Sequence, residues 1–435
     1  HCVIKQNDSH SFTDISYILN SKIWKVRPFL IEYKTETSEL QKSICNPLVE
    51  FVELPDTFEF HSYISAIFET IKRIKLANST VHSDRIFHRS LRKYKGKIKI
   101  VLNYLPKGHR TNIKNIENYL FHFLVSHCHH DLSVAMLITG QNNFLGGVHM
   151  HYTTISTHHL ASTYVTATKI LINKIMFDKN QDQIQIDTIP LPIQDGYVGS
   201  RLCPTHNFLQ SFIQNLIMTL QDPNLLKDDW KNYHNLYTIY TIMMQGFSTG
   251  YREVGNPYVT NKNISKLELN NHKILQITPI SDKDNSKFYK TRISLITDKT
   301  IQQLNHYQQH RQKVISKLHG SNRIFHKNAK SKSFFLFLDQ TVTEVRPKTI
   351  KHVIGEKFPL PLNVNRRYIR TNLLNMEINP DTINAFMGHW GSGTEYWGAY
   401  SSMAYLQHAE RLIPALTEIA SGLGWQAIKS MVVSK

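Results

Sequence analysis

Residues 387–402 read MGHWGSGTEYWGAYSS, and this stretch decides how the second half of the chain is interpreted. It holds one histidine, two tryptophans, two tyrosines and four glycines. The residues before it, DTINAFM, predict a short helix that ends at Gly388. The residues after it, MAYLQHAERLIPALTEIASGL, predict a final helix that Tyr400 enters. His389 and Tyr400 therefore flank a glycine-rich loop. This arrangement is more typical of a functional site than of a hydrophobic core.

Two arginine motifs precede this loop. FSTGYREVGNP places Arg252 just after a Thr-Gly pair, at the end of a long apolar helix predicted for residues 233–247. NRRYIRTNLLNM places Arg367 and Arg370 three residues apart, on one face of a predicted helix. Two guanidinium groups that face the same way repel each other unless an anion lies between them, and guanidinium groups suit phosphate oxygens. The pattern favours a phosphate site, although an arginine that caps a helix end is the commoner explanation for Arg252.

The charge of the chain points to a polyanionic partner. The sequence has 435 residues, with 51 Lys+Arg against 33 Asp+Glu, which gives a formal net charge of +18. A hydrophobic content of 41% is ordinary for a folded protein, so disorder throughout is excluded. Nucleic acid is the first expectation for the partner and an anionic membrane the second. A generally basic proteome is the alternative explanation of the charge.

No stretch of about 18 apolar residues is present, so no spanning helix is expected, and the first residues lack the apolar block of a signal peptide. We therefore expect a cytoplasmic protein associated with the nucleoid. The four cysteines lack CxxC spacing, which argues against a disulfide framework and against a four-thiolate zinc site. Histidines cluster at residues 127–130 and 149–159, but their spacing fits no known zinc motif. We expect neither a metal nor a cofactor.

Periodicity and composition divide the chain into four parts. Residues 1–47 give no confident element. Residues 48–178 are predicted as a helical, basic module, because apolar residues recur at intervals of three and four from about residue 57 to 176. Its basic charge makes DNA the expected ligand of this module. Residues 179–204 lose this period and gain Pro, Gly and Asp, which indicates a linker. Residues 205–435 are predicted as a second domain.

The second domain is expected to be mainly helical with a small antiparallel sheet, an α+β fold. Its first helix has an apolar face from residue 208 to 220, and Asn207 can cap it. NNHKILQITPI and FYKTRISLI predict two strands around the polar turn SDKDNSK, and a helix follows at about 300–318. From Arg311 to Lys332 there are seven Lys/Arg and no Asp/Glu, which indicates a solvated loop or, as the less favoured alternative, a phosphate-contacting surface.

Taken in order, these motifs resemble the catalytic domain of the tyrosine recombinases, the phage-integrase family. The resemblance covers about residues 205–425, and the GHW…YSS form is similar to large integrases of bacterial mobile elements. The residues at the family's positions are Arg252, Lys283, Arg367 with Arg370, His389 and Tyr400. The N-terminal part resembles the family only in being helical, basic and placed before the catalytic domain.

The resemblance implies a site-specific recombinase that cleaves and rejoins double-stranded DNA without a metal. Arg252 and Arg370 would clamp the phosphate, Lys283 would protonate the departing 5′ oxygen, and His389 would donate a hydrogen bond to the phosphate. Tyr400 would attack and store the bond as a 3′-phosphotyrosine. The resemblance also implies a tetramer on paired DNA sites, with accessory DNA-bending or directionality proteins as further candidate partners.

Two features depart from the family pattern. Arg367 occupies a position that usually holds His or Lys, and a guanidinium cannot accept the Tyr400 proton. We expect it to lower the pKa of the phenol while water or DNA takes the proton. The interval from His389 to Tyr400 is longer than is usual, so Tyr396 and Tyr405 remain competitors for the nucleophile. A DNA-binding relative that does not cut and a type IB topoisomerase are the alternative functions.

Overall fold

The computed structural model describes most of the chain. The described residues are 2–5, 15–28, 36–57, 60–62, 64–66, 68–69, 73, 96–97, 99–100, 112–127, 129, 131–141, 149–177, 191, 195–252, 259–268, 274–281, 291–321, 323–339, 341–390, 396, 401–402 and 404–433. The fold is mainly helical with small β-sheets, as predicted. Much of the helix pattern predicted between residues 70 and 111 lies outside the described residues.

The chain divides into two compact units. Unit 1 comprises His1–Tyr33 and Pro47–Gly199, and unit 2 comprises Lys34–Asn46 and Ser200–Lys435. The boundary between Gly199 and Ser200 lies within the linker predicted for residues 179–204. The short segment Lys34–Asn46, which contains helix α1 (Glu39–Ile44), belongs with unit 2 although it precedes most of unit 1 in the sequence.

Unit 1 contains a four-stranded sheet in the order β1-β2-β3-β4. The first pair is parallel and the other two pairs are antiparallel. Val52 and Leu54 of β4 are buried, whereas Glu53 between them pairs with Lys25 of β3 at 2.8 Å. This alternation is what a sheet with one buried face requires. The strands are β1 (Cys2–Lys5), β2 (Ile15–Ile18), β3 (Ile23–Val26) and β4 (Val52–Pro55).

Helices pack on this sheet and form the core of unit 1. Helix α6 is buried at six consecutive positions from Ser133 to Ile138, because its sequence is apolar all round. Its ends are capped by the Asp131 side chain and by Gly140 in the left-handed conformation. The other elements are α4 (Ile113–Glu117), α5 (Tyr119–Ser126), α6 (Leu132–Thr139), α8 (Thr157–Phe177) and the antiparallel pair β5 (Thr154–Ser156) and β6 (Tyr197–Gly199).

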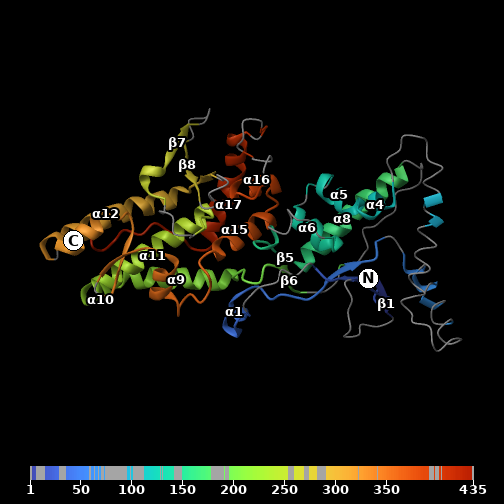
Figure 1. Cartoon of the computed structure of the whole chain (residues 1–435), viewed down its shortest axis with the longest axis horizontal. Coiled ribbons are helices and arrows are strands. Elements are labelled where there is room, and N and C mark those ends of the chain that lie inside the picture. Colours follow the sequence, from blue (N-terminus) through green and yellow to red (C-terminus); the bar gives the residue numbers. More distant parts are fainter. Residues whose placement is uncertain are drawn as a thin grey trace. The chain divides into compact units, whose positions relative to one another are not determined.

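Unit 2 is built around helix α11, in which every residue from Tyr233 to Thr249 is buried. It lies alongside α9, α12, α15 and α17 (Figure 1). The helices are α9 (His206–Gln221), α10 (Pro223–Asp228), α11 (Trp230–Thr249), α12 (Asp298–Ser321), α13 (Arg323–Lys330), α14 (Pro347–Ile354), α15 (Val364–Asn375), α16 (Pro380–Met387) and α17 (Tyr405–Gly422), with a 3-10 turn at Asn261–Asn263.

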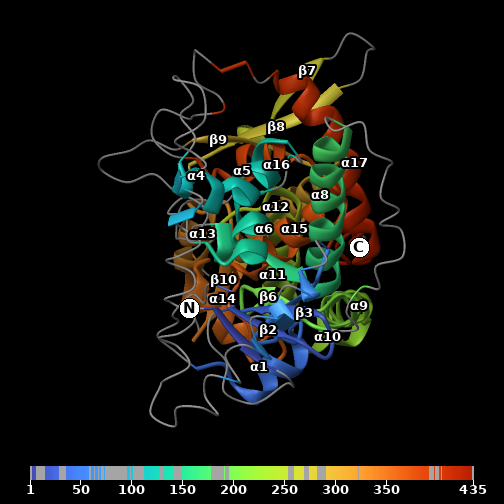
Figure 2. The same ribbon diagram turned by 90° about the vertical axis from the view of Figure 1, so that its right-hand side faces the viewer.

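Two small antiparallel sheets complete unit 2. One has the order β7-β8-β9 and the other is the pair β10-β11. The three-stranded sheet lies at the upper end of unit 2, away from α9 and α10, in both views (Figure 1 and Figure 2). The strands are β7 (Ser265–Glu268), β8 (Ile274–Ile280), β9 (Arg292–Leu295), β10 (Phe335–Leu338) and β11 (Thr341–Glu344).

Several predicted elements of unit 2 are confirmed. The two strands flanking SDKDNSK are β8 and β9, and they pair antiparallel. The apolar face of residues 208–220 is buried, but the cap of α9 is Thr205, whose hydroxyl accepts from the Phe208 amide at 3.3 Å, and not Asn207. Asn207 was the wrong choice because the helix begins at His206, two residues earlier than a cap at Asn207 requires.

The basic stretch from Arg311 to Lys332 was expected to be a loop, and this expectation is wrong. Apart from residue 322, which lies outside the described residues, it forms the end of α12 and the whole of α13. Ala329 and Val314 are buried in a small core of their own with Phe335 and Phe337. Apolar residues between the lysines therefore hold the segment in helices. Of the helices in the described residues, none is long and apolar enough to cross a membrane.

Candidate functional site

The candidate site begins where two helices of unit 2 end. Helix α11 ends at Gly250 and helix α16 ends at Gly388, with φ angles of 60° and 67°. These left-handed conformations suit glycine. A Cβ on Gly250 would lie 3.3 Å from the Phe386 ring, and a Cβ on Gly388 would lie 2.9 Å from Cδ of Arg292. The two helix ends therefore pack closely, and glycine allows each to turn there.

Arg292, on strand β9, joins the two helix ends. Its Nη1 donates to the carbonyl oxygens of Thr249 at 3.0 Å and Phe386 at 2.6 Å, and its Nη2 donates to that of Gly250 at 2.9 Å. The side chain is fully buried. The last carbonyls of a helix lack partners within the helix and carry the negative end of its dipole, so a guanidinium stabilises them well.

Arg366, on helix α15, joins the same ends from another side. It donates to the Gly250 carbonyl at 2.7 Å and to the Met387 carbonyl at 2.6 Å, and it is also fully buried. We call Arg292 and Arg366 together the arginine bracket. The bracket fixes the C-terminal ends of α11 and α16 side by side, and with them the residues that follow each end.

Arg366 also sets the tautomer of His389. Its Nη2 lies 3.2 Å from Nε2 of His389. A guanidinium only donates hydrogen bonds, so this Nε2 accepts, and the proton of a neutral imidazole is then on Nδ1. His389 is 4% exposed. Its Nδ1–H is therefore the donor that the ring can offer to another group.

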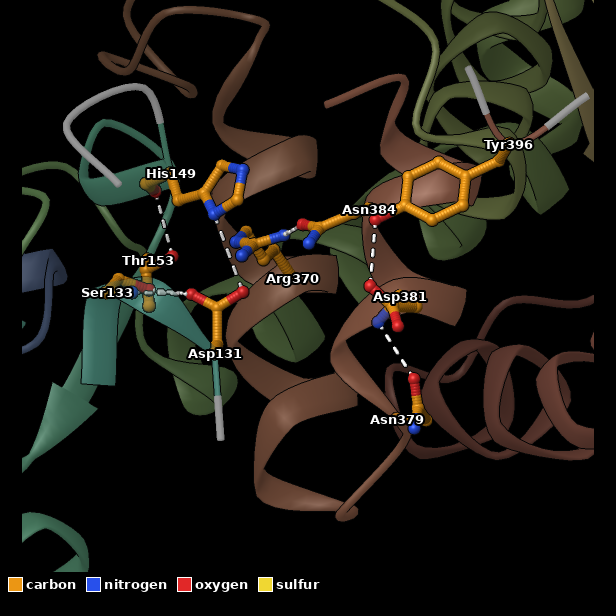
Figure 3. A network of polar contacts seen from close by, with 9 residues as sticks. All are labelled: Asp131, Ser133, His149, Thr153, Arg370, Asn379, Asp381, Asn384 and Tyr396. Atoms are coloured by element: carbon orange, nitrogen blue, oxygen red, sulfur yellow. Dashed lines mark hydrogen bonds and ion pairs between the residues drawn. The ribbon is translucent and has the colours of Figure 1, made fainter. Parts of the chain in front are cut away.

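Arg370 and His389 are both held by Asn384 of helix α16. Nη1 of Arg370 donates to Oδ1 of Asn384 at 2.9 Å (Figure 3). The backbone N–H of His389 donates to the backbone oxygen of Asn384 at 2.8 Å. Arg370 is fully buried. The structure thus brings together two of the predicted site residues, through a residue that the sequence did not single out.

Arg252 is placed by its neighbour Tyr251. The amide of Asn365, at the start of α15, donates to the Gly246 carbonyl at 2.8 Å and to the Tyr251 carbonyl at 2.9 Å. Tyr251 is buried, whereas Arg252 is partly exposed. Helix α15 therefore contacts the segments that carry Arg252 and His389, and it supplies Arg370 itself.

Arg367 has its described contacts elsewhere. Its Nη1 lies 3.5 Å from the Leu202 carbonyl, and its charge acts on the thiol of Cys45. The pKa of Cys45 is raised to about 12, chiefly by burial and also by nearby Cys203, whereas Arg367 lowers it. Although Arg367 and Arg370 share one helix, the structure gives them different partners in the described part of unit 2.

Lys283 and Tyr400 lie outside the described residues. The two competing tyrosines can be placed. The Tyr396 hydroxyl donates to Oδ1 of Asp381 at 2.9 Å, at the beginning of α16 (Figure 3), whereas His389 follows its end. Tyr405 is the first residue of α17, and burial raises its pKa, which disfavours the phenolate. Neither observation favours these residues as the nucleophile.

The histidine clusters of unit 1 have other described partners. Nδ1 of His149 lies 3.5 Å from Oδ2 of Asp131, and Thr153 donates to the His149 carbonyl (Figure 3). The ring of His127 stacks on Phe123 with ring centroids 5.0 Å apart. Within the described ranges, no group of three or more His, Cys, Asp or Glu residues could hold a metal ion.

Sequence reasoning missed Arg292, Arg366, Asn365 and Asn384. Arg292 could have been found, because it occurs in the apolar strand TRISLI at a position whose side chain is expected to face the core. No protein-family model matches the chain, and neither a curated protein nor a solved structure matches it significantly.

Proposed function

We propose that unit 2 cleaves and rejoins DNA through a covalent 3′-phosphotyrosyl intermediate on Tyr400. The Tyr400 oxygen attacks the scissile phosphorus, and the bond from phosphorus to the 5′ oxygen of the next nucleotide breaks. The phenolic proton passes to water or DNA, and Lys283 donates a proton to the leaving oxygen. Negative charge grows on the non-bridging oxygens at the transition state, so fixed cations and hydrogen-bond donors lower the barrier.

The observation that carries this proposal is the common attachment of Arg370 and His389 to Asn384. Asn384 thereby fixes the guanidinium of Arg370 and the backbone of His389 on one short helix, while Arg366 contacts the imidazole. Both side chains are buried, where a charge acts more strongly than in water. Fixed donors of this kind suit a phosphate whose charge grows during the reaction.

The other residues have defined parts in the proposal. Arg252 follows Tyr251, whose carbonyl Asn365 holds, and would complete the phosphate clamp. His389 would donate through Nδ1–H, because Arg366 occupies its Nε2. Arg367 would supply positive charge that lowers the phenol pKa, and a fully active Arg367→Ala protein would exclude it from the reaction. Exchange of strands between two DNA sites further requires protomers to pair, so we propose a tetramer.

The test is a covalent trap. A pool of duplexes with randomised sequence and a nick near each candidate cleavage point is incubated with the protein, and adducts are separated on a denaturing gel. After cleavage the short strand diffuses away, so the protein stays attached to the DNA. We expect an adduct with the wild-type protein, also in excess EDTA, because the proposed cations are side chains.

Three variants assign the nucleophile. Tyr400→Phe keeps the ring and removes only the attacking oxygen, so we expect it to bind the duplex pool and form no adduct. Tyr396→Phe and Tyr405→Phe are the matched controls and should still form it. Binding without any adduct from the wild-type protein would favour a DNA-binding relative that does not cut. Relaxation of supercoiled DNA without sequence preference would favour a topoisomerase.

A further inference from the structure

The most basic segment of unit 2 is a folded helical hairpin that the proposed chemistry does not use. We define the basic hairpin as residues 311–332, the end of α12 followed by α13. Seven Lys/Arg and no Asp/Glu occur in it. The exposed cations are Lys313, Lys317, Arg323, Lys327 and Lys330. Their charge is thus presented to solvent on two helices.

The hairpin is held in one conformation. Arg311 donates from Nε to the Lys332 carbonyl at 2.9 Å and from Nη2 to the carbonyls of Lys330 at 3.0 Å and Ala329 at 3.3 Å. These contacts tie the last turn of α13 to α12 and satisfy its final carbonyls. Val314 and Leu318 pack beneath it in the small core with Phe335 and Phe337. A fixed array of cations loses little entropy when it binds a rigid anion.

One lysine next to the hairpin adds positive charge. Lys231 lies over the ring of Phe325 with Nζ 5.7 Å from the centroid, and Lys317 of the hairpin lies over the ring of Trp230 at 4.3 Å. Four carboxylates of the described residues lie on or near α11 and the β10-β11 pair, which pack against the hairpin. Asp229 caps α11 and Glu344 pairs with Arg346 at 2.8 Å, whereas Asp228 and Asp339 are exposed.

The hairpin lies well away from the candidate site. Helix α12 runs antiparallel to α11, because Thr297 at its start lies 3.5 Å from Ser248 and His310 lies 2.9 Å from His234. At 1.5 Å per residue, the distance along α11 from Ser248 to His234 is about 21 Å. The exposed lysines lie beyond His310, which places them roughly 25–35 Å from the Gly250 end, or about seven to ten base pairs of duplex.

We infer that the basic hairpin binds the phosphate backbone of duplex DNA, outside the segment that reaches the candidate site. The inference rests on the proposed function in taking DNA as the ligand. A membrane surface fits less well, because the apolar side of both helices is buried in the small core, and Ile324 is the one large aliphatic residue that the described hairpin exposes strongly. An extended array of lysines suits a polyanion more than a single small anion.

The test neutralises three exposed lysines, as Lys313→Gln, Lys327→Gln and Lys330→Gln in one protein. The matched control neutralises three exposed lysines elsewhere in unit 2, as Lys227→Gln, Lys348→Gln and Lys351→Gln. Affinity for a 40-base-pair duplex is measured from 50 to 300 mM salt. Each lost phosphate contact lowers the slope of log K against log salt by about 0.9, so the hairpin variant should lose roughly 2–3 in slope and on the order of 10² in affinity at 150 mM.

An unchanged slope, or an equal change in the control, would overturn the inference. Thermal unfolding of both variants checks that neither change has damaged the fold. Vesicles with 30% anionic lipid provide a second ligand, and loss of vesicle binding with unchanged DNA binding would assign the hairpin to a membrane. Because the readout is equilibrium binding, a protein that binds DNA in this way but forms no adduct would contradict only the proposed cleavage.

Discussion

Arg292 and Arg366 donate to the same atom, the carbonyl oxygen of Gly250, at 2.9 and 2.7 Å. One arginine comes from a strand and the other from a helix, and both are fully buried. Each also donates to the last carbonyls of α16. The bracket therefore joins four elements of unit 2, namely β9, α15 and the ends of α11 and α16, through groups that keep their charge.

The first prediction concerns the stability that the bracket provides. Arg292→Ala should lower the free energy of unfolding by about 3–5 kcal/mol, because three helix-end carbonyls lose a charged partner inside the protein. Urea unfolding at pH 7 measures the loss. Arg346→Ala is the control, since this exposed arginine pairs with Glu344 and should change the free energy by less than about 1 kcal/mol. Similar values for the two variants would show that the bracket is not structural.

The second prediction concerns Gly388. Gly388→Ala has to place a Cβ 2.9 Å from Cδ of Arg292, which three hydrogen bonds hold in place. Gly424→Ala is the matched control, since Gly424 also has a positive φ, 81°, but has no atom within 4 Å of the new Cβ. The backbone cost is about 1–2 kcal/mol in both. Gly388→Ala should therefore lower the free energy of unfolding by at least about 1 kcal/mol more than Gly424→Ala does, and equal losses would show that only the backbone conformation matters.

Long periodic elements of the fold could be predicted from the sequence, and short ones could not. Helices α9, α11 and α12 and strand β8 extend over enough residues to show a period. Strand β9 has only four residues, but the polar turn SDKDNSK before it marked the hairpin. Strands β1 to β4 have four residues each, too few to distinguish from loop. In the basic hairpin, the many lysines and arginines made the segment look like a solvated loop. Its few apolar residues, such as Val314 and Ala329, are nevertheless buried against Phe335 and Phe337.

The sequence predicted several residues of the candidate site, but it did not predict the contacts that hold them in place. The resemblance of the motifs implied that Arg370 and His389 lie in the same region, and in the structure Asn384 contacts both. Arg366 and Arg367 are neighbours in the sequence and differ by about 100° around the helix. Only tertiary packing decides that Arg366 meets the helix ends while Arg367 reaches the Leu202 carbonyl.

The third prediction is a pH dependence that arises from two buried histidines. Nε2 of His234 lies 3.0 Å from the Phe335 carbonyl, which only accepts, so Nδ1 of His234 accepts from Nε2 of His310 at 2.9 Å. Nδ1 of His310 then accepts from the Ser430 hydroxyl at 2.7 Å. Both rings are neutral. The pKa of His234 is lowered to about 3, because burial lowers it most, the hydrogen bond to the Phe335 carbonyl raises it and Arg311 lowers it. Burial, and then the neighbouring His234, lower the pKa of His310 well below its usual value.

Because both histidine pKa values are lowered by folding, acid destabilises the folded protein. Below about pH 6.5 the unfolded chain takes up protons that the folded protein does not, so stability is full above pH 7 and falls as the pH drops from about 6.5 toward 3. The slope reaches about 1.4 kcal/mol per pH unit for each histidine. His234→Gln with His310→Gln should reduce this slope in urea unfolding between pH 7 and 4.5. Exposed His319→Gln, on the same helix α12, should leave it unchanged, and an unaltered slope in the double variant would contradict the assignment.

The fourth prediction concerns the proposed phosphate clamp. Arg370→Ala and Arg252→Ala should each lower the rate of adduct formation on the order of 10²–10³-fold, because each removes a cation that meets the growing charge. Affinity for DNA should largely persist, since many other phosphate contacts remain. Single-turnover trapping and equilibrium binding on the same nicked duplexes measure the two effects. Equal losses in both would make these arginines positioning residues for DNA.

The last prediction separates the charge of Arg370 from its structural role. Asn384→Asp keeps the shape of the side chain and puts a carboxylate against the guanidinium, where Oδ1 of Asn384 now accepts at 2.9 Å. The new ion pair should leave the free energy of unfolding unchanged or raise it, because the buried cation gains an opposite charge. Adduct formation should fall about 10²-fold, because the paired guanidinium has less charge to offer the phosphate. Asn384→Ala is the control: it removes the partner without adding charge, and it should lower stability while reducing cleavage less. If Asn384→Asp formed the adduct at the wild-type rate, the charge of Arg370 would have no part in cleavage, whatever its part in the fold.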